Sequence, residues 1–229
     1  MRYPIIGVIL AAGKGLRMGG LVPKQYQELA GRPILAHTLE AFDGAPSIDA
    51  IVIVSTDEDI IKEDIFKRWP IRKPISFVVG GRERQDSVWN ALNAIGDCEI
   101  VVIHDGVRPL IQISVIEESI TVARQFGAAV VGMPSKDTIK VADDQGFSIK
   151  TPDRSSLWMI QTPQTFKFSL LKEAHVKAEQ DSYIGTDDSS LLERMNLPVK
   201  LIEGGYDNIK ITTPDDLIIA SEILKSRRK

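Results

Sequence analysis

A loop of small residues that also carries two cations is the part of this sequence best suited to chemistry. Residues 10–19 read LAAGKGLRMG, and PKQY follows at residues 23–26. The alanines and glycines remove side-chain bulk, so that backbone N–H groups can approach an anion closely. Arg17 and Lys24 add two positive charges to the same segment. The pattern therefore predicts a site for phosphate groups.

Neither of the two standard glycine fingerprints accounts for this loop. A P-loop reads G-x-x-x-x-G-K-[ST], but after Gly15 and Gly20 the lysine position is taken by Leu21. The dinucleotide fingerprint G-x-G-x-x-G is met by Gly13 and Gly15, whereas Met18 stands where the third glycine belongs. We therefore expect a nucleotide-binding loop of another kind.

Two further polar segments follow apolar runs and are candidates for the same site. GGRERQDS occupies residues 80–87, and HDGVRP occupies residues 104–109. Ligands of parallel sheets bind beyond the carboxyl ends of the strands, where the loops that follow those strands meet. The sequence therefore predicts that these two segments and the glycine loop share one edge of a sheet.

Short apolar runs alternate with amphipathic segments along the chain, which is typical of a mainly parallel sheet with helices on both faces. The expected strands are residues 5–10, 50–55, 75–79, 99–104, 128–133 and 199–204. The expected helices are residues 33–42, 58–69, 84–95, 113–126, 167–179 and 187–195, and a last one with Thr213 as N-cap and Pro214 in its first position. The fold class is thus α/β, and we expect one domain over residues 1–229.

The alternation is interrupted between about residues 136 and 153. TIKVA and FSIKT are short alternating segments on either side of the turn DDQG. This arrangement predicts a β-hairpin arm that projects from the sheet. A hairpin that packs on nothing in its own domain exposes its edges, so we expect the arm to contact a partner.

Composition excludes several classes of protein. The net charge of −3 argues against a general surface for nucleic acid or anionic membranes. The single cysteine, Cys98, rules out an intrachain disulfide, and the three histidines lie too far apart in the sequence to predict a histidine-rich metal site. No apolar run is long enough to span a bilayer. The apolar start is expected to be a buried first strand rather than an export signal, so the cytoplasm is the expected compartment.

Taken whole, LAAGKGLRM followed by PKQ resembles the loop of sugar-phosphate nucleotidyltransferases. Further segments extend this resemblance in order along the chain: GGRERQDSV (80–88), HDGVRP (104–109), KDTIK (136–140), DRSSLWMIQTPQTF (153–166), TDDSSLLE (186–193) and EGGYDNIKITTPDDL (203–217). Together they are similar to the 2-C-methyl-D-erythritol 4-phosphate cytidylyltransferase (IspD) family. The resemblance implies a Rossmann-like sheet of the nucleotide-diphospho-sugar transferase type.

The resemblance also implies substrates and residue roles. CTP and the polyol phosphate would give a cytidine diphosphate-linked product and pyrophosphate, in the non-mevalonate isoprenoid pathway. Arg17 and Lys24 would stabilise the phosphorus under attack and the leaving group, and Arg154 and Lys210 would hold the attacking phosphate. Nucleotide contacts are expected from Ala11, Ala12, Gly13, Gly15, Gly81, Ser87 and Asp105, and substrate contacts from Arg108, Thr138, Thr162 and Thr186.

Magnesium is expected as the cofactor, because it prefers phosphate oxygens together with one or two carboxylates. Asp105 and Asp207 are the candidate ligands, although Asp105 could equally cap its loop and Asp207 could pair with Lys210. The family resemblance further implies a homodimer in which the arm embraces the neighbouring subunit. Thr138 and Arg154 would then complete the site of the other chain.

Some features depart from the family pattern, and two other readings stay open. Arg82 stands where the family often has an aspartate, and Gly106 and Val107 replace an often-seen alanine pair. Ribitol-5-phosphate cytidylyltransferases share the QTPQ and NIKITTP segments, so ribitol 5-phosphate is the alternative acceptor. A non-catalytic nucleotide sensor on the same fold is the alternative of another class; it would have no need of Arg17, Lys24 and Lys210.

Overall fold

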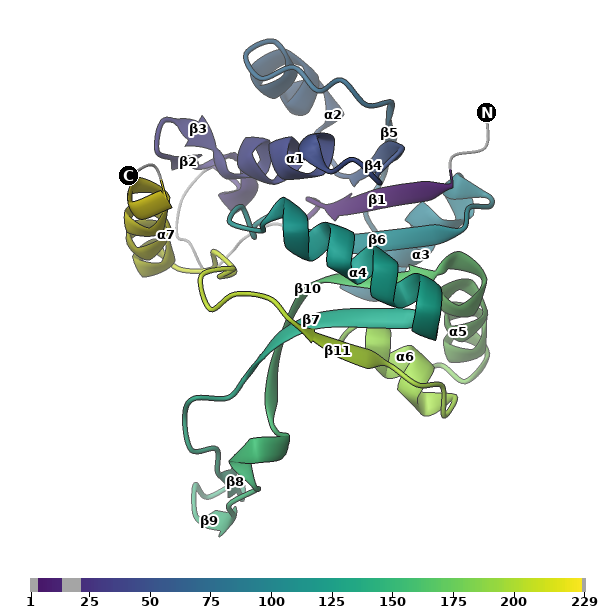
Figure 1. Ribbon diagram of the computed structural model, residues 1–229, viewed down its shortest axis with the longest axis vertical. Helices are drawn as coiled ribbons and strands as arrows, with labels where there is room; N and C mark the ends of the chain where they lie inside the picture. Colours follow the sequence, from purple (N-terminus) through teal and green to yellow (C-terminus); the bar gives the residue numbers. More distant parts are fainter. Residues whose placement is uncertain (1–3, 14–21, 228–229) are drawn as a thin grey trace.

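The computed structural model describes residues 4–13 and 22–227. Its centre is a seven-stranded sheet in the order β11-β7-β10-β6-β1-β4-β5 (Figure 1). The strands are β1 (Ile5–Leu10), β4 (Ala50–Val54), β5 (Ile75–Val78), β6 (Ile100–Asp105), β7 (Ala128–Pro134), β10 (Trp158–Lys167) and β11 (Lys200–Glu203). β10 is antiparallel to both of its neighbours, and the other pairs are parallel. The predicted α/β fold with a mainly parallel sheet is confirmed.

Helices cover both faces of this sheet because the strands are apolar on both faces. On one face, α1 (Ile34–Gly44) and α4 (Ile113–Phe126) bury Leu39, Phe42 and Ile116 against the sheet. On the other face lie α3 (Arg84–Ile95), α5 (Phe168–Gln180) and α6 (Asp188–Arg194). Leu92 and Leu171 belong to that second core layer. The expected bounds of α3 and α4 match the structure.

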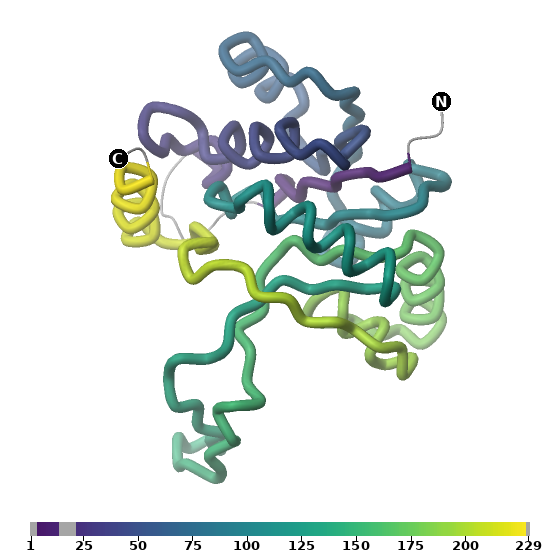
Figure 2. Tube along the Cα trace, viewed as in Figure 1, coloured from purple at the N-terminus to yellow at the C-terminus, as the bar shows by residue number. Residues whose placement is uncertain are grey.

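The last helix, α7 (Pro214–Arg227), forms a third and smaller core with the start of the chain. It packs beside a short hairpin of β2 (Glu28–Leu29) and β3 (Arg32–Pro33) (Figure 2). Leu29, Ile211 and Ala220 are buried together there. The short helix η2 (Lys24–Tyr26), which carries Lys24, precedes this hairpin and contacts α1.

Two elements differ from the sequence prediction. The helix expected over residues 58–69 is a short α2 (Glu58–Ile60) that continues as a π-helical segment, η3 (Ile61–Phe66). Ile61 and Ile65 are both buried in that segment, and their spacing suits either kind of helix. β10 was not predicted as a strand, because polar residues, including Gln164 and Thr165, fill its buried positions.

The arm projects from one end of the sheet as predicted (Figures 1 and 2). Its tip pairs β8 (Val141–Ala142) with β9 (Ser148–Lys150), and a short helix, η4 (Arg154–Ser156), lies in the returning leg. The Asp143 carboxylate accepts hydrogen bonds from the N–H groups of Gln145 and Phe147 at 3.0 and 2.8 Å, which fixes the turn. Within residues 4–13 and 22–227, no helix is long and apolar enough to cross a membrane.

Candidate functional site

A pocket of about 460 Å³ opens at the carboxyl edge of the sheet, where β1, β5 and β6 end. It brings together eight of the residues that the sequence predicted for the site: Ala11, Ala12, Gly13, Lys24, Gly81, Ser87, Asp105 and Lys210. The predicted meeting of the three loops at one edge is therefore confirmed. Gly15 and Arg17 lie outside the described residues.

The floor of the pocket is held by backbone contacts between strand ends. Ala11 donates its N–H to the carbonyl of Val54 at 2.8 Å, and its own carbonyl accepts the Gln25 side-chain amide at 2.7 Å. A Cβ on Gly80 would lie 2.3 Å from the Cβ of Ala12. Only glycine permits this close approach, so the small residues of the two loops are required for the loops to touch.

The turn that leads into α3 is held by its own side chains. The Ser87 hydroxyl accepts the N–H of Gly81 at 3.0 Å and donates to the carbonyl of Glu83 at 3.1 Å. Glu83 and Asp86 form a capping box at the start of the helix. These contacts fix the shape of the turn at the pocket wall and use the N–H groups of Gly81 and Glu83 within the protein.

Asp105 is the centre of the charges in the pocket. Its carboxylate lies 2.9 Å from Lys210 Nζ, 3.4 Å from Arg84 Nε and 3.6 Å from Arg108 Nε. Burial raises the pKa of this carboxyl. The positive charges of Arg84, Lys210 and Arg108 lower it by a larger amount, so that the pKa lies well below its usual value. Asp105 is therefore an anion throughout the physiological range.

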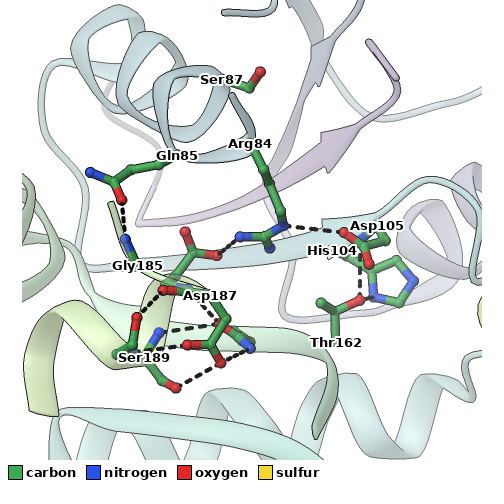
Figure 3. A network of polar contacts seen from close by, with 12 residues as sticks. Arg84, Gln85, Ser87, His104, Asp105, Thr162, Gly185, Asp187 and Ser189 are labelled. Atoms are coloured by element: carbon green, nitrogen blue, oxygen red, sulfur yellow. Dashed lines mark hydrogen bonds and ion pairs between the residues drawn. The ribbon is translucent and has the colours of Figure 1, made fainter. Parts of the chain in front are cut away.

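Thr162 and His104, two buried residues next to Asp105, fix the backbone of Asp105 (Figure 3). The Thr162 hydroxyl accepts the N–H of Asp105 at 3.1 Å and lies 3.0 Å from His104 Nδ1. His104 Nε2 lies 3.1 Å from the Arg108 carbonyl, so the hydroxyl donates to Nδ1 when Nε2 carries the proton. Burial lowers the pKa of His104 to about 4. The hydroxyl of Thr162, which the sequence suggested as a substrate contact, is thus used within the protein.

The other predicted site residues lie outside the residues that line the pocket. Arg108 donates to the carbonyl of Asn208 at 2.9 Å, and Thr186 is exposed just before α6. Thr138 and Arg154 are exposed on the arm. Their roles stay predictions.

Asp207 pairs with Arg227 rather than with Lys210. Among the residues that the structure describes, no three histidine, cysteine, aspartate or glutamate side chains form a group that could hold a metal ion. Asp105 is the one of the two candidate magnesium ligands that lines the pocket.

Sequence reasoning missed Arg84, which joins Asp105 to Asp188. Arg84 is the first residue of α3, where the helix dipole disfavours a positive charge. A positive charge at this position indicates, from the local sequence alone, that a carboxylate elsewhere in the protein neutralises Arg84. The partner itself, Asp188, is 104 residues away in the chain, and nothing in the local sequence points to it.

Backbone N–H groups, small residues and lysines around one pocket can bind a polyphosphate and stabilise charge that develops on it. Asp105 is held as an anion by its cations, and both nitrogens of His104 make hydrogen bonds inside the protein. The arrangement therefore suits a reaction driven by positioning and electrostatics, as phosphoryl and nucleotidyl transfers are. Fold and site together define a nucleotidyltransferase.

Comparison with known proteins gives the family. Residues 5–226 match the model of "IspD: 2-C-methyl-D-erythritol 4-phosphate cytidylyltransferase". An enzyme of that name from Clostridium perfringens (strain SM101) is 48% identical over 223 residues, which cover 96% of this chain and 99% of the relative. One from Geobacillus thermodenitrificans is 49% identical over 221 residues, which cover 96% of each chain.

Solved structures agree with this assignment. The crystal structure of 4-diphosphocytidyl-2C-methyl-D-erythritol synthase from Anaerococcus prevotii is similar with a TM-score of 0.85 and 36% identity, over 96% of this chain and 98% of that one. The chain belongs to the 2-C-methyl-D-erythritol 4-phosphate cytidylyltransferase family.

Proposed function

We propose that this chain transfers the cytidylyl group of CTP to 2-C-methyl-D-erythritol 4-phosphate, in the non-mevalonate route to isoprenoids. Family membership over residues 5–226 supports the reaction. The single observation that carries the chemistry is the pocket in which Lys24, Lys210 and the two glycine-bearing turns surround Asp105. The matched family and the relatives reported above are named for 2-C-methyl-D-erythritol 4-phosphate and not for ribitol 5-phosphate.

The chemical step needs charge neutralisation more than proton transfer. A phosphate oxygen of the acceptor attacks the α-phosphorus of CTP, the bond from the α-phosphorus to the bridging oxygen breaks, and pyrophosphate leaves. The attacking oxygen is already ionised at neutral pH, so no base has to remove a proton from it. Lys24 stabilises the phosphorus under attack and the leaving group, and Lys210 holds the attacking phosphate. Arg17, by its place in the family pattern, joins Lys24 in this role.

Nucleotide selection falls to the opposite wall of the pocket. Ala11, Ala12 and Gly81 line that wall; because the N–H groups of Ala11 and Gly81 are bonded within the protein, these two residues present carbonyl acceptors rather than donors to a base. A pocket that pairs every polar atom of cytosine discriminates against uracil, whose exchanged donor and acceptor leave partners unsatisfied. Ser87 contributes by holding the Gly81 backbone in place.

Magnesium fits the donor chemistry at one position. Asp105 is a single ionised carboxylate at the pocket wall, which suits an ion that takes its other ligands from phosphate oxygens and water. Asp105 would hold the ion, and the ion would neutralise charge on the triphosphate. Asp207 is the weaker candidate because it does not line the pocket; both carboxylates are paired with cations, so the ion would compete with Lys210 at Asp105 and with Arg227 at Asp207.

We propose a homodimer in which the arm carries Arg154 and Thr138 to the site of the neighbouring subunit. Two observations support it: neither residue lines the pocket of its own chain, and four apolar side chains of the arm are 43% to 67% exposed (Ile139, Val141, Phe147 and Ile149). The cytoplasm is the proposed compartment, since CTP and phosphorylated polyols are cytoplasmic metabolites.

Pyrophosphate release with CTP and magnesium tests the proposed reaction. Parallel assays contain 2-C-methyl-D-erythritol 4-phosphate, ribitol 5-phosphate or no acceptor. Release with the first acceptor alone is the expected result. Release with ribitol 5-phosphate alone would move the chain to the alternative substrate, and CTP binding without any release would support the sensor.

A further inference from the structure

Arg84 bridges two carboxylates, Asp105 at the pocket wall and Asp188 behind it, at the start of α6. Its Nε lies 3.4 Å from Asp105 Oδ1 (Figure 3). Its Nη1 donates to Asp188 Oδ2 at 2.7 Å. The other oxygen of Asp105, Oδ2, lies 2.9 Å from Lys210 Nζ and forms an ion pair with it. Four groups of alternating charge therefore run from Asp188 at the start of α6 to Lys210 in the pocket.

The far end of this chain of charges is rigidly placed. The side chain of Asp188 is only 1% exposed, and a buried carboxylate needs a partner to offset its lost hydration. Gln164, in the central strand β10, accepts the N–H of Asp188 at 3.1 Å and donates to the Asp187 side chain at 2.8 Å. Asp188 is thereby anchored to the sheet, while its carboxylate is directed at Arg84.

The position of Arg84 explains why two carboxylates are needed. Burial lowers the pKa of Arg84. The negative charges of Asp188 and Asp105 raise it by a larger amount, so that the pKa lies above its usual value. With Asp188 removed, the guanidinium would keep one partner, Asp105, and would turn fully onto it. Because Asp105 also holds Lys210, a closer Arg84 would displace that lysine.

We propose that Asp188 is a positioning residue of the active site: acting through Arg84, it sets the orientation of Asp105 and, through Asp105, the place of Lys210. The inference rests on the proposed function only for the consequence in turnover, since the contacts exist whatever the acceptor is.

A double-mutant cycle tests the coupling through turnover. Asp188→Asn is expected to lower kcat about tenfold, with the dissociation constant for CTP changed by less than about twofold. Asp188→Glu, which keeps the charge, is expected to retain most of kcat. In the Arg84→Gln background the Asp188→Asn change is expected to add nothing. Independent, additive losses would overturn the proposal, as would a uniform loss in both kcat and CTP binding.

Asp181→Asn is the matched control. It makes the same chemical change in the same part of the molecule and breaks the exposed ion pair from Asp181 to Arg194, which is 2.8 Å long. It is expected to leave kcat unchanged. Should Asp188→Asn not fold, as judged by thermal denaturation, Arg84→Lys replaces it, because a single ammonium cannot bridge both carboxylates. A kcat of Arg84→Lys equal to that of the wild type would overturn the proposal.

Chemical labelling gives a readout that does not depend on the substrate. The rate at which an amine reagent modifies Lys210, relative to the exposed Lys225, is expected to rise several-fold in Asp188→Asn and not in Asp181→Asn. An unchanged Lys210 rate would overturn the proposal even in an active enzyme. Failure of the proposed function is a separate outcome: the wild type would release no pyrophosphate with 2-C-methyl-D-erythritol 4-phosphate, while the labelling result would still stand.

Discussion

The pocket and the arm belong to one chain, yet they are held in place in opposite ways. At the pocket, Asp105 is 6% exposed and is surrounded by contacts to β1, β10 and the cations. On the arm, every residue from 136 to 151 is exposed, and the apolar Phe147 and Ile149 are each 67% exposed. The first region is organised by its own core, whereas the second has little of the described chain to pack against.

This difference matches what each region has to do. A site that works by fixed charges needs them in place before the substrate arrives, because reorganisation would consume the stabilisation they supply. A surface made to meet another subunit has to stay uncovered until that subunit is present. Disturbing the pocket should therefore change turnover at any protein concentration, whereas disturbing the arm should produce effects that depend on concentration.

The largest expected effect comes from Lys24. Lys24→Ala should lower kcat by about 10²–10³-fold, the scale for losing one group that stabilises transition-state charge. CTP binding should change much less, because the contribution of Lys24 grows as charge builds on the leaving group. Steady-state kinetics together with CTP titration separates the two quantities. If only the Michaelis constant for CTP rose, Lys24 would be a ground-state contact.

How far the sequence predicts the fold depends on whether a pattern is local. Residues 84–95 and 113–126 are helices with the expected bounds, because their apolar spacing and their flanking residues lie within the segment itself. β10 escapes the same reasoning. Its buried Gln164 is satisfied by Asp187, Asp188 and Ser189, so its polar residues indicate a loop unless those distant partners are known.

The candidate site follows the same rule. The segments of Ala12 and Gly81 could be placed at the pocket because each follows an expected strand, and Ala12 also belongs to a loop of small residues that implies close backbone approach. Ion pairs could not. Asp207 lies three residues from Lys210 in the chain, yet it pairs with Arg227, while Lys210 pairs with Asp105, about a hundred residues earlier. Which cation meets which carboxylate is decided by the tertiary fold, which brings α7 to Asp207 and the end of β6 to Lys210.

The next largest effect concerns the arm, and it distinguishes a partner's site from the chain's own. Arg154→Ala should lower kcat/KM roughly 10–100-fold, on the scale of one lost hydrogen bond to a charged group. If Arg154 serves the neighbouring subunit, mixing Arg154→Ala with Lys24→Ala lets half of the dimers pair unlike chains, each with one complete site. Activity should then return to about a quarter of the wild-type value.

The control for this experiment is each variant alone at the same total concentration. Pyrophosphate release is measured after the chains have had time to exchange. No recovery upon mixing, with exchange verified by a tagged chain, would place Arg154 in the site of its own subunit and would contradict the arm-swapped arrangement.

A smaller effect is expected at the tip of the arm. Phe147→Ser removes an apolar side chain that is 67% exposed. If that side chain is buried in the dimer, the change should weaken dimerisation by about 1.5 kcal/mol for each of the two chains. Analytical ultracentrifugation over a dilution series measures the shift, roughly a hundredfold in dissociation constant. Asp144→Ser, on the same turn but without an apolar side chain, is the matched control. Equal dissociation constants for Phe147→Ser and the wild type would mean that the tip faces solvent.

The smallest expected effect concerns a buried residue of the core, His175, and the pH dependence of the free energy of unfolding. His175, in α5, is 3% exposed and stacks on Trp89 at 5.8 Å, and burial lowers its pKa despite the nearby charge of Asp188. Below the ordinary histidine pKa of about 6.5 the unfolded chain binds a proton that the folded protein does not, so the free energy of unfolding falls as the pH falls. His175→Phe keeps a stacked ring and removes this proton. Urea unfolding at about pH 7.5 and about pH 5.5 should then show a loss smaller than that of the wild type by up to about 1.4 kcal/mol. Equal losses in the two proteins would mean that His175 binds its proton in the folded core as readily as in the unfolded chain, with the attraction of Asp188 balancing the effect of burial.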